Sequence, residues 1–223
     1  MNRLLLVFLA LLVAPPLVAQ SSDGIAGRVE GPTYISPSGA FRIRIPVLPE
    51  LGGRIQDTPT AVTFQDDFNV LCTIAAIPMD ATQRWEHSTR GAKDYLAWFF
   101  ANFIMPDFQA SYPGARVENV RFAAGIAEGT LFAYIVLPEG SMFNHKLAFL
   151  GPGTPLPDAK RGNMLFVRNN WVYVLSVELA ERVLERSTYS KTPEEEDAIL
   201  RERLVALFEK MTFPTPTPTE SAP

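Results

Sequence analysis

The stretch TLFAYIVL, residues 130–137, is apolar at even and odd positions alike. Successive side chains of a β-strand point to opposite faces of its sheet, so a strand of this composition needs cover on both faces. NVLCTIAAI, residues 69–77, has the same character, and Pro78 and Pro138 directly follow the two stretches. Both stretches are therefore predicted to be central strands of a sheet that carries a further layer on each side.

Two other regions predict strands with defined turns. The segments 163–168 and 171–178 flank Asn169-Asn170, and asparagine tolerates the positive φ that a two-residue hairpin requires. TYISPSGAFRIRIP, residues 33–46, begins with a Pro/Gly turn and continues as alternating apolar and arginine residues. Pro46 lacks the N–H that would extend this strand. We expect an antiparallel hairpin near the C-terminus and a half-buried strand at the start of the fold.

Two helices are predicted. The first is expected to begin at Ser88 or Thr89 and to stop at Pro106, with its apolar residues at helical spacing: Ala92, Leu96, Phe99 and Phe103. The second begins with Thr192 as N-cap and Glu195 three residues later, a capping-box pattern. Its apolar stripe consists of Leu200, Leu204, Leu207, Phe208 and Met211. Asp197 and Arg201 are expected to pair on its exposed side. A short helix or irregular link is expected over residues 179–187.

Strands that are apolar on both faces, with few helices between them, indicate a mixed α/β (α+β) fold. We predict a three-layer α/β/α sandwich with a largely antiparallel central sheet. Residues 21–213 are expected to form a single domain, which is long enough to bury a substantial core. The last stretch, residues 214–223, is PTPTPTESAP, whose composition predicts a disordered tail.

Residues 1–20, MNRLLLVFLALLVAPPLVAQ, are typical of a signal peptide. Arg3 precedes a short apolar run, and cleavage is expected near Ala19. A retained membrane anchor stays open as an alternative, because Leu17 is a poor residue two places before that cut. No later run approaches the ~20 apolar residues of a membrane span, so no integral membrane segment is expected in the mature chain. The predicted location is secreted or periplasmic.

Charge and cysteine content narrow the classes of partner. The formal net charge is −4, and loss of Arg3 with the leader makes the mature chain slightly more acidic. This balance argues against nucleic acid or an anionic membrane as the main partner. Cys72 is the single cysteine, so no disulfide can form within the chain. The core must therefore hold the fold without a covalent cross-link.

The two ends of the expected domain resemble those of the PsbP-like family, which includes an extrinsic photosystem protein and the Ran-binding Mog-type proteins. The resemblance rests on TYISPSGAFRIRIP at the start, and on WVYVLSVE followed by a helix that closes on FEKMTF at the end. The usual Gly-Phe of the family is Gly39-Ala40-Phe41 here, and Val47 replaces an aromatic residue. The resemblance implies an α/β/α sandwich used for binding or assembly, and it transfers no functional residue.

Residues that could carry chemistry do not form a motif. The two histidines, His87 and His145, are far apart in sequence, and Ser141 in PEGS lacks the second glycine of a nucleophile elbow. Cys72 lies in an apolar run and is expected to be a buried thiol. A metal site would have to combine Glu86 and His87 with distant residues such as Asp66, Asp67 or His145. We therefore assign no catalytic, cofactor-binding or metal-ligating residue and expect no cofactor.

Two stretches could form a contact surface. Aromatic residues crowd the first predicted helix (Trp98, Phe99, Phe100 and Phe103), and burial against the sheet is expected rather than an exposed docking patch. The stretch GPGTPLPDAKRGN, residues 151–163, is expected to be a solvated loop that ends in Lys160-Arg161, with a contact surface as the alternative. The sequence predicts an exported accessory or binding module for a protein or small ligand. A hydrolase with an unrecognised site, or a structural component of an envelope assembly, is the alternative.

Overall fold

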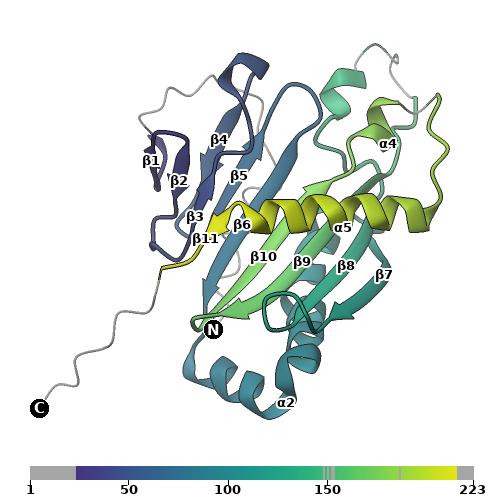
Figure 1. Cartoon of the computed structure of the whole chain (residues 1–223). Helices are drawn as coiled ribbons and strands as arrows, with labels where there is room; N and C mark the ends of the chain where they lie inside the picture. Colours follow the sequence, from purple (N-terminus) through teal and green to yellow (C-terminus); the bar gives the residue numbers. More distant parts are fainter. Residues whose placement is uncertain (1–23, 148, 150, 152–153, 186, 215–223) are drawn as a thin grey trace, which may run out of the picture.

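The computed structural model describes residues 24–147, 149, 151, 154–185 and 187–214 (Figure 1). The predicted signal peptide, residues 1–20, and residues 215–223 of the predicted tail lie outside the described residues. The expectations for both segments stay predictions.

The central sheet has seven strands in the order β4-β5-β6-β10-β9-β8-β7, and every neighbouring pair is antiparallel (Figure 1). Its strands are β4 (Arg54–Asp57), β5 (Ala61–Gln65), β6 (Leu71–Pro78), β7 (Arg116–Ala123), β8 (Thr130–Leu137), β9 (Ala159–Arg168) and β10 (Trp171–Glu178). A smaller sheet is ordered β1 (Arg28–Glu30), β2 (Thr33–Ile35), β3 (Arg42–Arg44) and β11 (Met211–Thr212). The predicted antiparallel sheet is confirmed.

Helices lie on both faces of the seven-stranded sheet (Figure 1). One face packs α5 (Pro193–Glu209) and the small sheet; the other packs α2 (Ala81–Phe99), a π-helical turn over Phe100–Ile104, and α3 (Met105–Ser111). Short helices are η2 (Pro49–Leu51), η4 (Asn144–Leu147) and α4 (Glu181–Leu184). In the described residues no helix combines the length and apolar character needed to cross a membrane. The predicted α/β/α sandwich is confirmed.

The strands that are apolar on both faces explain why the sheet is covered by a further layer on each side. Along β8, Phe132 and Tyr134 belong to the core under α5, whereas Leu131, Ala133 and Ile135 belong to the core under α2 and α3. All eight residues of β8 are buried. Each face of the sheet thus removes its own set of apolar side chains from water. This burial stabilises the folded state by about 25 cal/mol per Å² of apolar surface.

The first helix differs from its prediction at both ends. It begins at Ala81 because Asp80 and Gln83 form a capping box, while the hydroxyls of Ser88 and Thr89 donate to the Trp85 carbonyl. Gly91, at φ 77°, kinks the helix. Pro106 does not stop the helical run, because it lies in the first turn of α3, where its missing N–H costs little.

Three other local predictions are confirmed, whereas Met211, expected on the apolar stripe of the second helix, pairs with Ile43 in β11 because α5 ends at Glu209. Thr192 and Glu195 exchange the two hydrogen bonds of a capping box at the start of α5. The β9–β10 hairpin turns at Asn169 and Asn170, at φ 51° and 61°. In the turn before β3, the Gly39 N–H donates to the Ser36 carbonyl at 2.9 Å, and Gly39 takes φ 70°.

Candidate functional site

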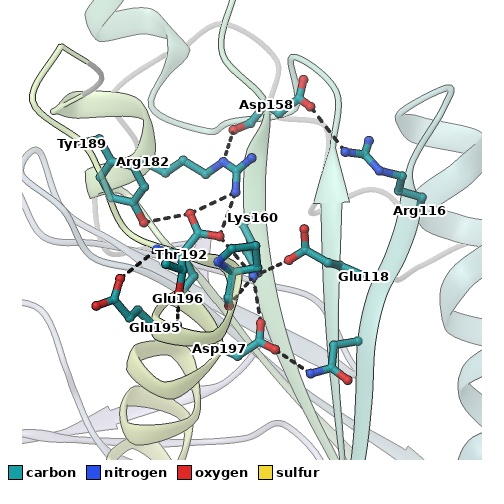
Figure 2. Close-up of polar contacts among 12 residues, drawn as sticks. Arg116, Glu118, Asp158, Lys160, Arg182, Tyr189, Thr192, Glu195, Glu196 and Asp197 are labelled. Carbon is teal, nitrogen blue, oxygen red and sulfur yellow. Dashed lines mark hydrogen bonds and ion pairs between the residues drawn. The ribbon is translucent and has the colours of Figure 1, made fainter.

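Lys160 is the centre of a buried ionic cluster that joins β7, β9 and α5 (Figure 2). Its side chain is fully buried, and its Nζ lies 2.8 Å from Asp197 Oδ1 and 3.1 Å from Glu196 Oε2. Nζ also pairs with Glu118 and donates to the Pro193 carbonyl at 3.1 Å. A buried charge is tolerated only when it is paired in this way.

The N-terminal part of α5 supplies two of the three carboxylates, Glu196 in its first turn and Asp197 directly after it. The capping box places Glu196 and Asp197 at the N-terminal end of the helix, where the helix dipole also favours negative charge. Glu118 comes from β7 and remains partly exposed. The cluster therefore ties the start of α5 to two neighbouring strands of the sheet.

A second ring of partners holds the carboxylates in place. Arg182 Nη1 donates to Glu196 Oε1 at 3.0 Å and Oε2 at 2.9 Å, and the Tyr189 hydroxyl donates to Glu196 Oε1 at 2.9 Å. Asn119 Nδ2 donates to Asp197 Oδ2 at 2.7 Å. The acids of this cluster already have partners inside the protein.

The electrostatics of the cluster keep Lys160 charged. Burial by itself lowers the pKa of Lys160, but its pairing with Asp197, Glu118 and Glu196 outweighs burial and raises the pKa above its ordinary value. A general base or Schiff-base lysine needs the opposite shift, toward a neutral amine. The arrangement fits a structural clamp rather than a reactive amine.

Arg161, the next residue along β9, points to the opposite face of the sheet and forms a second buried ion pair. Its Nε and Nη2 donate to Glu178 Oε2 at 3.1 and 3.0 Å. The Ser141 hydroxyl donates to Glu178 Oε1 at 2.5 Å, and the Met142 N–H donates to Oε2 at 3.3 Å. Ser141 thus serves to satisfy a buried carboxylate.

These two pairs correct the prediction for residues 151–163. The strand β9 begins at Ala159, and Lys160 and Arg161 are buried within it instead of ending a solvated loop. The predicted exposed pair of Asp197 with Arg201 is also wrong, because Asp197 turns inward to Lys160. The partners that pair with these buried charges lie on distant segments of the chain, which sequence spacing does not reveal.

The other candidate residues are dispersed. His87 is on α2, after β6, and His145 is on η4, after β8; these elements lie at opposite ends of the sheet (Figure 1). Burial lowers the pKa of His87, which packs against the Tyr95 ring, and the exposed His145 contacts the Met142 carbonyl. No group of three or more His, Cys, Asp or Glu residues within the described ranges is placed to hold a metal.

Cys72 and Asp66 have structural roles. Cys72 is 3% exposed on β6, and burial raises the pKa of its thiol to about 12. The expectation of a buried thiol is confirmed. Asp66 Oδ1 accepts the backbone N–H groups of residues 68, 69 and 70, each at 2.9 Å, and so shapes the β5–β6 turn.

The crowded aromatic residues are mostly in the core, as expected. Phe99 and Phe100 are buried, and Trp98 and Phe103 are partly buried against the same cluster. Trp85, earlier on α2, is instead 62% exposed.

An exposed apolar surface lies at the end of the sheet away from α2. Leu48 directly precedes the short η2 helix and Leu51 is its last residue, and Phe68, 55% exposed, lies at the tip of the β5–β6 hairpin. The Asp67 N–H donates to the Leu51 carbonyl at 3.1 Å, which joins the two turns. We call Leu48, Leu51 and Phe68 the hairpin-tip surface.

Polar groups surround the hairpin-tip surface and hold its shape. Lys146 Nζ donates to the Phe68 carbonyl at 3.0 Å and lies 5.8 Å from the Phe68 ring centre. Arg54 pairs with Asp67. Gly52 has φ 72°, and a Cβ there would lie 2.0 Å from Asp67 Oδ2, so glycine permits this close approach of the turns. Sequence reasoning missed this surface because its three apolar residues follow no strand or helix period.

The chain is similar to solved structures at low sequence identity. Cyanobacterial PsbP (CyanoP) from Synechocystis sp. PCC 6803 matches with a TM-score of 0.48 and 10% identity, over 90% of this chain and 100% of that one. The Saccharomyces cerevisiae Ran-binding protein Mog1p matches with a TM-score of 0.41 and 9% identity, over 85% of this chain and 96% of that one. Both neighbours come from the groups of proteins that the sequence resemblance named, and the likenesses concern the fold alone. No family model and no curated protein sequence matches the chain.

Proposed function

We propose that this chain is an exported accessory module that binds a protein partner through the hairpin-tip surface. The observation that carries the proposal is that Leu48, Leu51 and Phe68 are exposed on two turns that a backbone hydrogen bond joins. Charged side chains contact the same turns: Arg54 pairs with Asp67, and Lys146 donates to the Phe68 carbonyl. Protein interfaces share this anatomy, with an apolar and aromatic centre and a polar rim.

The ionic clusters support binding over catalysis. Lys160 stays charged, and the carboxylates of Glu178 and Glu196 accept several internal hydrogen bonds each. Groups that are satisfied in this way are poorly placed to exchange protons with a substrate. The export part of the proposal rests on the residue pattern of the leader.

A matched pair of variants tests the surface. Phe68→Asp changes the centre of the hairpin-tip surface, whereas Trp85→Asp changes an equally exposed aromatic residue on α2. Mature protein that carries a photo-crosslinker at position 51 would be incubated with extracts of its native compartment, and cross-linked peptides would be mapped by mass spectrometry. We expect a protein partner that wild type and Trp85→Asp capture equally and that Phe68→Asp captures at least about tenfold less, as for an interface hot spot.

Two results would overturn the proposal. One is loss of capture by both variants, since that would mean non-specific adhesion of exposed aromatic residues. The other is retention of every captured protein by Phe68→Asp. Circular dichroism and thermal unfolding of each variant would establish that it is folded.

A further inference from the structure

The strand β7 is an open edge of the large sheet (Figure 1). Within the described part of the chain, no strand pairs with its outer side. Val117 and Val120 are 41% and 43% exposed, and Arg116, Glu118 and Arg121 are exposed as well. At the opposite edge, β4, the chain segment before β1 contacts the end of the strand, because the Asp57 carboxylate accepts hydrogen bonds from the N–H groups of Ala26 and Gly27. An open edge is a template for another strand.

A β-bulge sets which side chains share a face of β7. Val117 lies opposite Ile135 and Asn119 lies opposite Tyr134, so Glu118 is the extra residue. Glu118 and Asn119 both reach the α5 side, where they contact Lys160 and Asp197. The apolar residues Val117, Val120 and Phe122 lie opposite members of the core on the α2 side: Ile135, Ala133 and Leu131.

We propose that β7 pairs antiparallel with β7 of a second copy of this chain about a two-fold axis at Val120. In this register Val120 lies opposite Val120 of the other copy, and Val117 lies opposite Phe122 on the same face. On the other face Glu118 lies opposite Arg121. The pairing is isologous, so each of these contacts occurs twice.

Charge selects this register over its neighbours. Paired antiparallel residues must share a face, so the register can move only in two-residue steps. The Glu118–Asn119 bulge counts as one position of the strand. A two-residue step in one direction then places Arg121 opposite Arg116 of the other copy. A step in the other direction places Arg121 opposite Arg121 of the other copy. Like charges directly opposite one another are destabilising, whereas opposite charges stabilise a cross-strand pair.

The same argument identifies the occupant as a second copy. The strand itself provides both halves of the pattern: an acid and a base on one face, and three apolar residues on the other. Without the bulge, Glu118 and Arg121 would lie on opposite faces, because their numbers differ in parity. The extra residue brings both to the face on which they can meet.

A cross-linking pair tests the position of the axis. In mature full-length protein treated with the thiol oxidant diamide, Val120→Cys is expected to give a disulfide-linked dimer, because opposed antiparallel residues lie within disulfide reach. Val117→Cys, equally exposed but opposed to Phe122, is the control and is expected to stay largely unlinked. Cys72 is buried, so it does not compete. Equal linking of both variants, or of neither, would contradict the register.

A charge-swap pair tests the chemistry of the contact. Glu118 also pairs with Lys160 within each copy, so circular dichroism and thermal unfolding first establish that each variant is folded. In the folded variants, Arg121→Glu and Glu118→Arg each replace two attractive contacts between the copies by repulsive ones. Each alone should therefore weaken the dimer by at least about tenfold in dissociation constant. Mixing the two variants restores both Glu–Arg contacts and should restore a heterodimer, measured by sedimentation with one variant fluorescently labelled. Wild type that stays monomeric at every concentration, or variants whose mixture forms no heterodimer, would overturn the proposal.

Discussion

Lys160 places a full positive charge in the interior, and its three carboxylate partners belong to β7 and α5. Lys160→Met should lower the free energy of unfolding by about 3–5 kcal/mol, because the buried carboxylates lose their counter-charge. Urea denaturation measures this change. Lys93→Met, at an exposed position on α2, is the control and should stay within about 0.5 kcal/mol of wild type. A loss below about 1 kcal/mol for Lys160→Met would mean that the carboxylates find other partners or protons.

Asp107 on α3 is a partly buried acid, and no hydrogen-bond partner is found for its Oδ2 atom within the described residues. Burial raises its pKa to about 6. The folded state therefore holds this proton at a pH where the unfolded chain has released it, and stability falls as pH rises between about 4 and 6.

Asp107→Asn should remove this part of the pH dependence. We expect it to stabilise the protein at pH 7 by about 1 kcal/mol, less than the full shift implies because the carboxyl is partly solvated. Thermal unfolding from pH 4 to pH 7 compares it with Asp94→Asn, an exposed control on α2. Parallel pH profiles for wild type and Asp107→Asn would contradict the assignment.

At the scale of elements, α5 rests on β9 through a glycine. A Cβ on Gly162 would lie 2.9 Å from Leu200 Cβ and 3.1 Å from Leu204 Cδ1, closer than side chains pack. The same face of β9 holds Lys160, so the contact of α5 with the sheet combines close packing with ion pairs. The two constraints together set the height and position of the helix over the sheet.

Gly162→Ala should push α5 away from the sheet and cost about 1–3 kcal/mol, the usual cost of overpacking. Gly125→Ala is the control, because a Cβ there meets no atom within 4 Å. Chemical denaturation of the two variants gives the comparison. A neutral Gly162→Ala would show that Leu200 and Leu204 repack freely.

For the whole molecule, the two faces of the sheet carry separate cores, while exposed apolar residues are left at the hairpin tip and along β7. The leader pattern predicts that this molecule works outside the cytoplasm. Intact mass of protein recovered from the periplasm or medium should show cleavage near Ala19 or Gln20. Recovery with Met1 retained, in a membrane fraction, would favour an anchor instead.

The sequence by itself determined the layered fold, because apolar residues on both parities of residues 130–137 can be satisfied only by cover on both faces of a sheet. It also determined the start of α5 and the Asn169-Asn170 turn, because caps and turns depend on residues a few positions apart. Tertiary structure alone decided the burial of Lys160 and Arg161 and the inward turn of Asp197. Their partners are tens of residues away in the sequence. Burial of a charge costs free energy unless such a partner pairs with it, so the sequence around each charged residue does not predict its burial. Tertiary structure also decided the hairpin-tip surface and the self-complementary edge of β7. Both depend on which segments the fold places side by side and which segments it leaves uncovered.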